Sequence, residues 1–289
     1  MKEIREKAYA KLNISLDVMD SRADGYHDML MVMQTVTLWD DIHIVLNSEG
    51  RMSAASNLRF IPADERNLAV KAAIRFFKEL GEENTGAHID MQKRIPVGAG
   101  MAGGSADAAA VLRGLNKLYD RKFSLEKLME LGADVGSDVP FCVMGGTALA
   151  QGRGEILSPL PPMPECSFVI CKPEFSISTP ELFKKLDACP MRRHPDTQGI
   201  IQALEDGDLV RICRRMYNVF EDVDDRRMRS VGEIKGALLD NGAISAMMTG
   251  TGSAVFGVYE DETAANKALE AMEGLCPFSC VAKPVSIEN

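Results

Sequence analysis

The sequence predicts an α+β protein of two domains, because strand-like and helix-like segments are mixed without regular β–α–β alternation. Apolar residues occupy every second position over residues 8–18, which is the period of a strand with one buried face. A helical pattern covers residues 67–80 and stops at a glycine. Four prolines within residues 158–164 cannot continue a helix or an inner strand. We therefore place a domain boundary there, giving domains 1–158 and 159–289.

The other elements follow in chain order. In the first domain we expect strands at residues 30–38 and 42–46, joined by Trp39-Asp-Asp41, a strand at residues 89–95, a helix to Tyr119 and a helix at residues 125–131. In the second we expect strands at residues 167–171, before Gly250, at 254–259 and near 279–285, with helices from Ser178 to about Asp240 and at 262–274. Thr179 is the expected cap of the first of these helices, with Pro180 at its first helical position.

Composition narrows the class of protein. The chain has 289 residues, 46% of them hydrophobic, and a net charge of −9. An acidic chain without a block of basic residues argues against general binding to nucleic acid or to an anionic membrane. Residues 1–11 lack the apolar stretch of a secretory signal, and the seven scattered cysteines are typical of reduced thiols. We expect a cytoplasmic protein whose binding site is locally basic if its ligand is an anion.

The segment with the most informative chemistry is the glycine-rich stretch at residues 96–106, Pro-Val-Gly-Ala-Gly-Met-Ala-Gly-Gly-Ser-Ala. It fits the dinucleotide pattern G-x-G-x-x-G, but the strand and acidic residue that this fold requires next are replaced by another helix. It also resembles a P-loop in which Gly104 stands where the lysine belongs. A plain turn needs less glycine, and each glycine costs backbone entropy.

The loop also leads into a helix. The first amides of a helix have no partner within it, and together with the helix dipole they form an anion site. Gly103 and Gly104 would let phosphate oxygens approach the backbone, and Ser105 has a hydroxyl for a phosphate or its Mg²⁺. We therefore predict that the loop binds the phosphates of a nucleotide.

The loop is one of several motifs that together resemble the GHMP kinases, a family of small-molecule kinases. The motifs, in the order in which that family has them, are Lys11-Leu-Asn-Ile14, Arg22-Ala-Asp-Gly-Tyr-His27, residues 96–106, residues 131–141, Gly152-Arg-Gly-Glu155, Lys172-Pro173, Ser178-Thr179, Asn218-Val-Phe-Glu221 and Gly250-Thr-Gly-Ser253. The resemblance covers nearly the whole chain. Asn218-Val-Phe-Glu221 departs from the more common Asn-Asp form.

The resemblance implies a fold and a reaction. The fold would pair an N-terminal domain like ribosomal protein S5 domain 2 with a C-terminal ferredoxin-like domain, with the active site in the cleft between them. ATP would be the phosphoryl donor, with Mg²⁺ as its default metal. The Arg22–His27 motif is most similar to members that phosphorylate the 2-hydroxyl of an alcohol joined to cytidine diphosphate, in the non-mevalonate route to isoprenoids.

The resemblance also implies roles for single residues. Asp138 matches the family's catalytic base and Lys11 its partner lysine, although an aspartate before Val-Pro often only shapes a turn and a lysine on a strand face is usually solvated. Asp134, four residues before Asp138, is another aspartate that could be mistaken for the base, but the family match favours Asp138. The ATP-binding residues would be Pro96, Val97, Gly98, Ala99, Gly100, Met101, Ala102, Gly103, Gly104, Ser105 and Ala106. The substrate-binding residues would be Asn13, Tyr26, His27, Thr179 and Phe183, with the aromatic members forming a cytosine pocket.

Three alternatives remain open from the sequence. The first is another small-molecule kinase of the same family, such as a homoserine or mevalonate kinase. The second is an NAD-dependent dehydrogenase that uses Gly98, Gly100 and Gly103. The third is a relative that binds nucleotide without catalysis, against which Lys11 and Asp138 argue.

Overall fold

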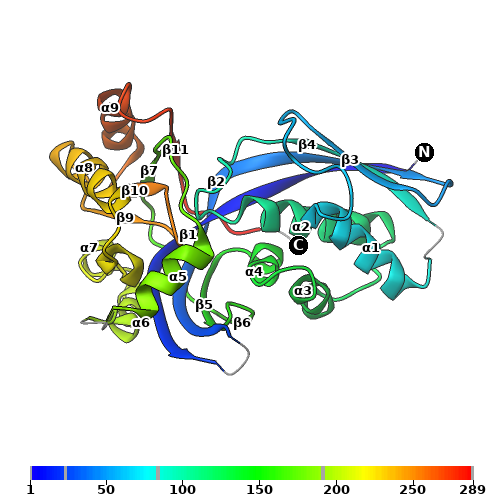
Figure 1. Ribbon diagram of the computed structural model, residues 1–289, viewed down its shortest axis with the longest axis horizontal. Helices are drawn as coiled ribbons and strands as arrows, with labels where there is room; N and C mark the ends of the chain where they lie inside the picture. Colours follow the sequence, from blue (N-terminus) through cyan, green and yellow to red (C-terminus); the bar gives the residue numbers. More distant parts are fainter. Residues whose placement is uncertain (1, 23–24, 83–84, 190–192, 288–289) are drawn as a thin grey trace.

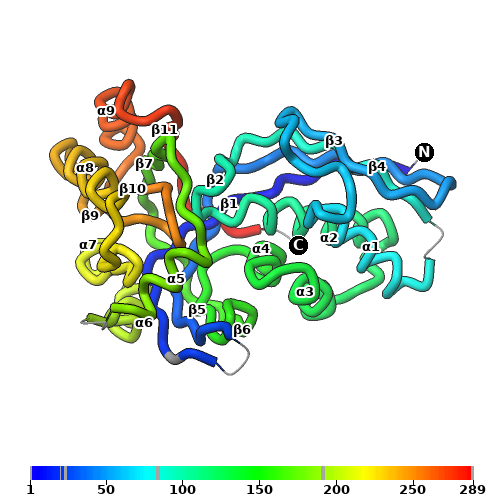
Figure 2. Tube along the Cα trace, in the orientation of Figure 1, coloured from blue at the N-terminus to red at the C-terminus, as the bar shows by residue number. Residues whose placement is uncertain are grey.

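The computed structural model describes residues 2–22, 25–82, 85–189 and 193–287. It confirms the α+β class: two sheets lie in the two halves of the molecule, each with helices against it. Figure 1 shows the halves side by side, with the N-terminus at the right and the helices of the C-terminal half at the left. In the tube view of Figure 2, the first two strands run across much of the molecule, from the right-hand half to its lower left.

The larger sheet has seven strands and a central antiparallel pair. Its strands are β1 (Glu3–Ser21), β2 (His27–Asn47), β3 (Met52–Ser56), β4 (Gly86–Gln92), β5 (Thr147–Gly152), β6 (Ile156–Pro159) and β8 (Tyr217–Asn218). Their order is β3-β4-β2-β1-β8, with β5 paired to β2 and β6 to β5. The short strand β8 comes from the second half of the chain and pairs with β1 in parallel.

Strand β1 follows the predicted period of two but is buried on both faces over its middle. Ala10, Leu12 and Ile14 are fully buried on one face, as expected. Lys11 and Asn13 on the other face are also buried, at 4% and 0% exposure. Residues of the second half of the chain cover this face, which a periodicity argument within one segment does not detect.

Helices cover one side of this sheet. They are α1 (Leu68–Leu80), α2 (Gly103–Leu118), α3 (Leu125–Ala133) and α4 (Val139–Met144). Helix α2 packs on β1 and β2, and its middle, rich in alanine, is almost completely buried. Small side chains allow this close approach: a Cβ on Gly114 would lie 2.8 Å from Ile44 of β2.

The smaller sheet has the strand order of a ferredoxin-like domain. Its strands are β7 (Ser167–Lys172), β9 (Ser245–Met248), β10 (Val255–Tyr259) and β11 (Phe278–Ala282), and its helices are α5 (Thr179–Asp187), α6 (Thr197–Glu205), α7 (Leu209–Cys213), α8 (Arg227–Asp240) and α9 (Glu262–Met272), with the 3₁₀ turn η1 (Val219–Asp222). The spatial order is β11-β7-β10-β9, all antiparallel. In chain order this is fourth, first, third, second, as in the split β–α–β arrangement.

Some elements differ from the sequence prediction. Residues 27–47 form one continuous strand rather than two strands joined at Trp39-Asp-Asp41. Asp40 does not interrupt the strand, because its buried carboxylate accepts hydrogen bonds from the backbone amides of Arg94 and Ile95. Strands β3, β5 and β6 and helix α4 were not predicted; each is only four to six residues long. Across the described ranges, no helix has the length and apolar character needed to cross a membrane.

Candidate active site

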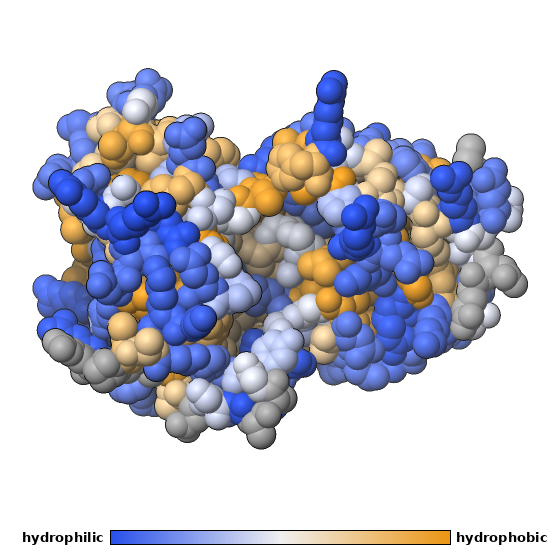
Figure 3. Space-filling view, in the orientation of Figure 1, coloured by the Kyte–Doolittle hydropathy of each residue, from blue (hydrophilic) through white to orange (hydrophobic). Residues whose placement is uncertain are grey.

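A cavity of about 630 Å³ lies between the two halves of the chain. Its wall includes Lys11 and Asn13 from β1, Asp138 at the start of α4, and Thr179 and Phe183 from α5. The space-filling view in Figure 3 shows a hollow between the two halves. Residues predicted to bind a substrate, and far apart in the sequence, therefore line one cavity.

A second cavity, of about 340 Å³, lies on the other side of the glycine-rich loop. Its wall contains residues 95–105, together with Lys93, Asp107, Ile61, Pro62, Arg66, Asn67 and Leu68. Gly98, Gly100 and Ala102 line both cavities. The loop is thus the common wall of two neighbouring cavities, an arrangement that allows a group to pass from a donor in one to an acceptor in the other.

The loop has a backbone conformation that suits glycine. Gly98 and Gly100 have φ of 65° and 76°, and Ala102, the N-cap of α2, has φ of 56°. A Cβ on Gly100 would lie 2.2 Å from the carbonyl oxygen of Thr249, so a side chain there would clash with the backbone. The loop is therefore closely packed against the turn that follows β9.

The N-terminus of α2 opens onto the second cavity. Ala106 is the first residue of the helix whose amide bonds back along the chain, to the carbonyl of Ala102 at 2.8 Å. The amides of Gly103, Gly104 and Ser105 precede it, and these residues line the cavity. Such amides, with the positive end of the helix dipole, favour an anion. Ser105 lines the same cavity, and a serine hydroxyl is a suitable oxygen ligand for the Mg²⁺ that would accompany bound phosphates.

The turn after β9 forms hydrogen bonds with the glycine-rich loop. The Thr249 hydroxyl lies 3.4 Å from the carbonyl oxygen of Gly100, and the Ala254 amide donates to the Ala99 carbonyl at 3.1 Å. The side chain of Asn218 donates to the carbonyl oxygens of Met248 and Gly250, both at 2.8 Å. Asn218 therefore braces the turn.

Lys11 is buried and points at its neighbour on the strand. Its Nζ donates to Asn13 Oδ1 at 2.6 Å. The backbone amide of Asn13 donates to the Thr249 hydroxyl at 3.0 Å. Burial lowers the pKa of Lys11 from its ordinary value of 10.5, and the negative charge of Asp138 opposes that effect. An amine with a lowered pKa next to a carboxylate is typical of catalytic sites.

Asp138 is the N-cap residue of α4, but its side chain caps no backbone amide. The carboxylate faces the first cavity instead, and Oδ1 lies 3.8 Å from the place where a Cβ on Gly154 would be. A glycine at position 154 therefore leaves space beside the carboxylate. Asp134, the other aspartate considered, lies at the end of α3. It forms an ion pair with Arg75 at 2.8 Å, and its side chain is 59% exposed.

Aromatic side chains lie together in one part of the wall of the first cavity, which we call its aromatic end. His27 stacks on Phe183, with ring centroids 4.8 Å apart, and Phe183 packs edge-on against Phe220 at 4.9 Å. His27 Nε2 lies 2.7 Å from Asp187 Oδ1. Tyr26 is 54% exposed and lies at the cavity wall. Flat faces and polar edges of this kind suit a nucleobase.

Thr179 lines the first cavity but does not cap α5. Ser178 is the N-cap residue, without a side-chain hydrogen bond to the helix, and the helix begins at Thr179. The Thr179 hydroxyl is instead 2.8 Å from the hydroxyl of Thr251, in the turn after β9. The predicted cap was therefore wrong by one residue, and the threonine hydroxyl is presented to the cavity.

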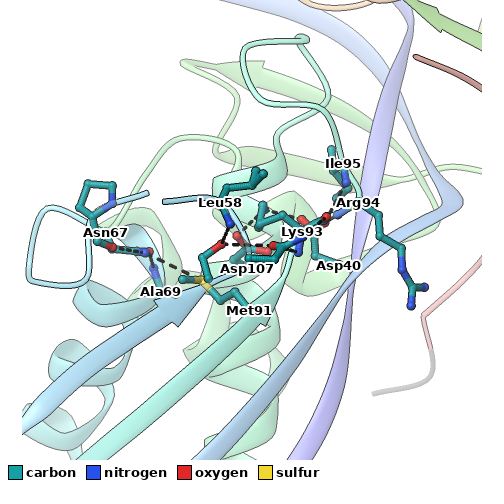
Figure 4. Close-up of polar contacts among 12 residues, drawn as sticks. Asp40, Leu58, Asn67, Ala69, Met91, Lys93, Arg94, Ile95 and Asp107 are labelled. Atoms are coloured by element: carbon teal, nitrogen blue, oxygen red, sulfur yellow. Dashed lines mark hydrogen bonds and ion pairs between the residues drawn. The ribbon is translucent and has the colours of Figure 1, made fainter. Parts of the chain in front are cut away.

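A buried ion cluster lies next to the second cavity (Figure 4). The Lys93 amine pairs with Asp40 and with Asp107, the latter at 2.5 Å, and all three side chains are at most 5% exposed. Burial raises the pKa of Asp107 to about 8, and the positive charge of Lys93 opposes that effect. A Cβ on Gly103 would be 3.6 Å from the Lys93 amine, so the cluster lies next to the glycine-rich loop.

Several residues that line the cavities were not predicted. Arg153, Lys184 and Asp187 line the first cavity, and Ile61, Pro62, Arg66, Asn67 and Leu68 line the second. Arg153 and Asn218 lie within motifs that the sequence analysis singled out without a role. Of the Arg22–His27 motif, Ala23 and Asp24 lie outside the described residues.

Comparisons with known proteins match both halves of the chain to one family. The model of the GHMP kinases N terminal domain matches residues 67–146, and that of the GHMP kinases C terminal domain matches residues 200–277. A protein of Clostridium perfringens (strain SM101) named 4-diphosphocytidyl-2-C-methyl-D-erythritol kinase is 44% identical over 96% of both chains. A protein of the same name from Bacillus velezensis is 44% identical over 99% of this chain and 98% of its own.

Solved structures agree with this assignment. A crystal structure of 4-(cytidine 5′-diphospho)-2C-methyl-D-erythritol kinase superposes with a TM-score of 0.79 and 30% identity, over 97% of this chain and 98% of the other. A homoserine kinase from Cytophaga hutchinsonii has the same TM-score at 22% identity, over 99% of this chain and 96% of its own, and shows the fold alone.

Proposed function

The chain belongs to the GHMP kinases, and from this premise we propose that it transfers the terminal phosphoryl group of ATP to the 2-hydroxyl of 4-diphosphocytidyl-2-C-methyl-D-erythritol. The observation that carries the proposal is the glycine-rich loop as the common wall of two cavities, with Lys11 and Asp138 in the larger one. The relatives that are 44% identical over nearly full length support this substrate. The reaction would be one step of the non-mevalonate route to isoprenoids.

ATP is the donor, and we assign its phosphates to residues 96–106 and its base and ribose to the second cavity. The free amides at the start of α2 would bind the phosphate oxygens, and Gly103 and Gly104 leave that approach open. Ile61, Pro62 and Leu68 supply apolar surface for a purine in the same cavity. With Mg²⁺ bound, charge on the phosphates would be neutralised, and Ser105 is the candidate side-chain ligand.

Asp138 is the proposed base and Lys11 its charge partner. The substrate hydroxyl forms a bond to the γ-phosphorus, its proton passes to Asp138, and the bond to the bridging oxygen breaks to release ADP. The positive charge of Lys11 would keep the carboxylate ionised and stabilise the developing negative charge on the oxygen. The bond from Lys11 to Asn13, which is itself held by Thr249, orients the amine.

The substrate would extend from Asp138 to the aromatic end of the first cavity. Tyr26, His27 and Phe183 would surround the cytosine, because they lie together at the cavity wall. Asn13 and Thr179 would contact the sugar and phosphate groups. The lining of this cavity is locally basic within an acidic chain, as an anionic substrate requires, because its cations outnumber its carboxylates. The cations are Lys11, Arg153 and Lys184, and the carboxylates are Asp138 and Asp187.

Two further assignments belong to the proposal. We keep the boundary between the ATP-binding and C-terminal domains at residues 158 and 159, although β6 ends at Pro159 and β8 joins the larger sheet. All seven cysteines are free thiols, which supports the cytoplasm as the place of the reaction.

The test is direct turnover. The protein is incubated with Mg-ATP and 4-diphosphocytidyl-2-C-methyl-D-erythritol, and ADP and a monophosphorylated product are measured, with homoserine and mevalonate as competing substrates. Lys11→Ala and Asp138→Asn should each lower kcat by about 10²- to 10⁴-fold in folded protein. Near-normal turnover in either variant removes that residue from the mechanism, and turnover of homoserine or mevalonate alone refutes the substrate.

A further inference from the structure

The turn between β5 and β6 places a charged side chain on the wall of the first cavity. Arg153 lies in this turn, in the motif Gly152-Arg-Gly-Glu155. Its guanidinium carbon is 5.3 Å from the ring centroid of Tyr26, at the aromatic end of the cavity. The next residue, Gly154, is the one that faces Asp138 Oδ1. The turn that carries Arg153 therefore lies between the place proposed for the cytosine, at Tyr26, and the place proposed for phosphoryl transfer, at Asp138.

The guanidinium is weakly compensated. Within the described ranges, its one ionic partner is Glu155, whose Oε1 is 3.7 Å from Arg153 Nε, longer than a hydrogen bond. The other carboxylate oxygen of Glu155 accepts a hydrogen bond from the Arg153 backbone amide at 2.6 Å. Glu155 thus holds the turn, while the side chain of Arg153, 35% exposed, keeps donors for another anion.

The other cations of the cavity are less suited to this position. The Lys11 amine is bonded to Asn13 and lies in the field of Asp138, at the transfer end. Lys184 lies on α5, with an exposed side chain. A lysine amine is a single point charge, whereas a guanidinium presents a planar fork that matches two phosphate oxygens.

We propose that Arg153 binds the diphosphate of the nucleoside diphosphate substrate and that its contact with the Tyr26 ring couples this grip to binding of the base. In such a substrate the diphosphate joins the nucleoside to the alcohol, so it must lie between the aromatic end and Asp138, where Arg153 is. Stacking on Tyr26 would hold the fork in place before the substrate arrives. This inference rests on the proposed function.

The experiment compares cytidine 5′-diphosphate with cytidine, which has the same base and no phosphate. Calorimetry with Arg153→Ala should show cytidine 5′-diphosphate binding weakened by about 10- to 100-fold, and cytidine binding weakened far less. Arg153→Lys should fall between Arg153→Ala and the unaltered protein, because it keeps the charge and loses the fork. Arg153→Gln, which keeps most of the side-chain length, should match Arg153→Ala.

Steady-state kinetics supply the second measurement. Arg153→Ala should raise KM for the cytidyl substrate by a similar factor and leave KM for ATP within about threefold. Arg229→Ala is the matched control, because it removes one cation with an 87% exposed side chain from α8, outside the cavity lining. It should leave both constants unchanged.

The outcomes separate the two proposals. Unaltered binding of cytidine 5′-diphosphate in Arg153→Ala, or equal losses for the diphosphate and cytidine, overturns the role of Arg153 while wild-type turnover still supports the proposed function. If the unaltered protein neither binds cytidine 5′-diphosphate nor phosphorylates the cytidyl substrate, the proposed function fails, and this inference fails with it.

Discussion

Replacing Asp225 by asparagine should loosen α5, the helix that carries Thr179 and Phe183 to the wall of the first cavity. The Asp225 side chain is 1% exposed and ties this helix to the start of α8. Lys185 of α5 donates to Asp225 Oδ2 at 2.7 Å, and Arg227 of α8 donates to both carboxylate oxygens, at 2.6 and 2.7 Å. Asparagine keeps the shape and loses the charge that holds the two cations together.

The size of the effect follows from these contacts. A hydrogen bond between charged groups contributes about 1.5–3 kcal/mol, but bonds to one carboxylate are not additive. The side chains of Lys185 and Arg227 are 37% and 20% exposed, so water compensates part of their loss. We expect the Asp225→Asn change to lower the free energy of unfolding by about 2–3 kcal/mol at pH 7.

The dependence on pH has a definite sign. The hydrogen bonds from Arg227, and then from Lys185, hold the pKa of Asp225 well below its ordinary value of 3.8. A lowered pKa contributes stability that is present above the unfolded value and lost as the pH falls toward the folded value. The deficit of Asp225→Asn should therefore be the same at pH 7 and pH 5 and should narrow by about 1 kcal/mol at pH 3.

Urea unfolding at the three pH values measures how far Asp225→Asn lowers the free energy of unfolding. Steady-state kinetics measure the effect of the substitution on the first cavity. KM for the cytidyl substrate should rise several-fold, with KM for ATP unchanged, because α5 lines only the first cavity. Asp206→Asn is the control: this carboxylate also pairs with an arginine but is 42% exposed, and its loss should leave stability nearly unchanged. A deficit that is as large at pH 3 as at pH 7 refutes the charge argument.

Three other substitutions, one of them with a matched control, test the loop, the ion cluster and the aromatic end. Gly100→Ala should lower the free energy of unfolding by at least about 2 kcal/mol, because of its φ of 76° and the carbonyl 2.2 Å from the new Cβ, and it should raise KM for ATP, whereas Gly104→Ala, with 3.6 Å of space, should be nearly neutral in urea unfolding. Lys93→Met leaves two buried carboxylates without a cation and should cost about 3–5 kcal/mol by the same measurement. Phe183→Ala removes the ring stacked on His27 and should raise KM for the cytidyl substrate about tenfold, with little change for ATP; an unchanged KM contradicts the aromatic pocket.

The sequence predicted the local features of the site better than their surroundings. Strand periodicity put Lys11 and Asn13 on one face, and the structure has them bonded to each other there. Periodicity did not reveal that the face is buried, because the residues that cover it, such as Thr249, come from more than 200 positions away. The turn at Gly250 packs against Gly100, a contact between distant positions that local patterning does not give.

Other features could not be predicted because tertiary contacts override local sequence rules. An acidic pair such as Asp40-Asp41 usually ends a strand, yet here the first carboxylate serves as a buried acceptor for two amides. Helix α4 is six residues long and begins with Val-Pro, so it has too little pattern to be recognised. Arg153 was within a recognised motif, but only the fold brings its guanidinium to Tyr26.

The way the loop is held explains how a glycine-rich segment can position a reacting phosphate. Strand β1 contributes the Lys11 amide, which donates to the Met101 carbonyl at 3.2 Å, and the turn before β10 contributes the Ala254 amide, which donates to the Ala99 carbonyl at 3.1 Å. One bond comes from each half of the molecule, so both halves fix the same three residues of the loop. Under the proposed function, Lys11 uses its backbone amide on the donor side and its side-chain amine on the acceptor side. A shift of β1 relative to the loop would therefore disturb donor and acceptor together, which is a physical reason for building this site on a strand with a buried middle rather than on flexible loops.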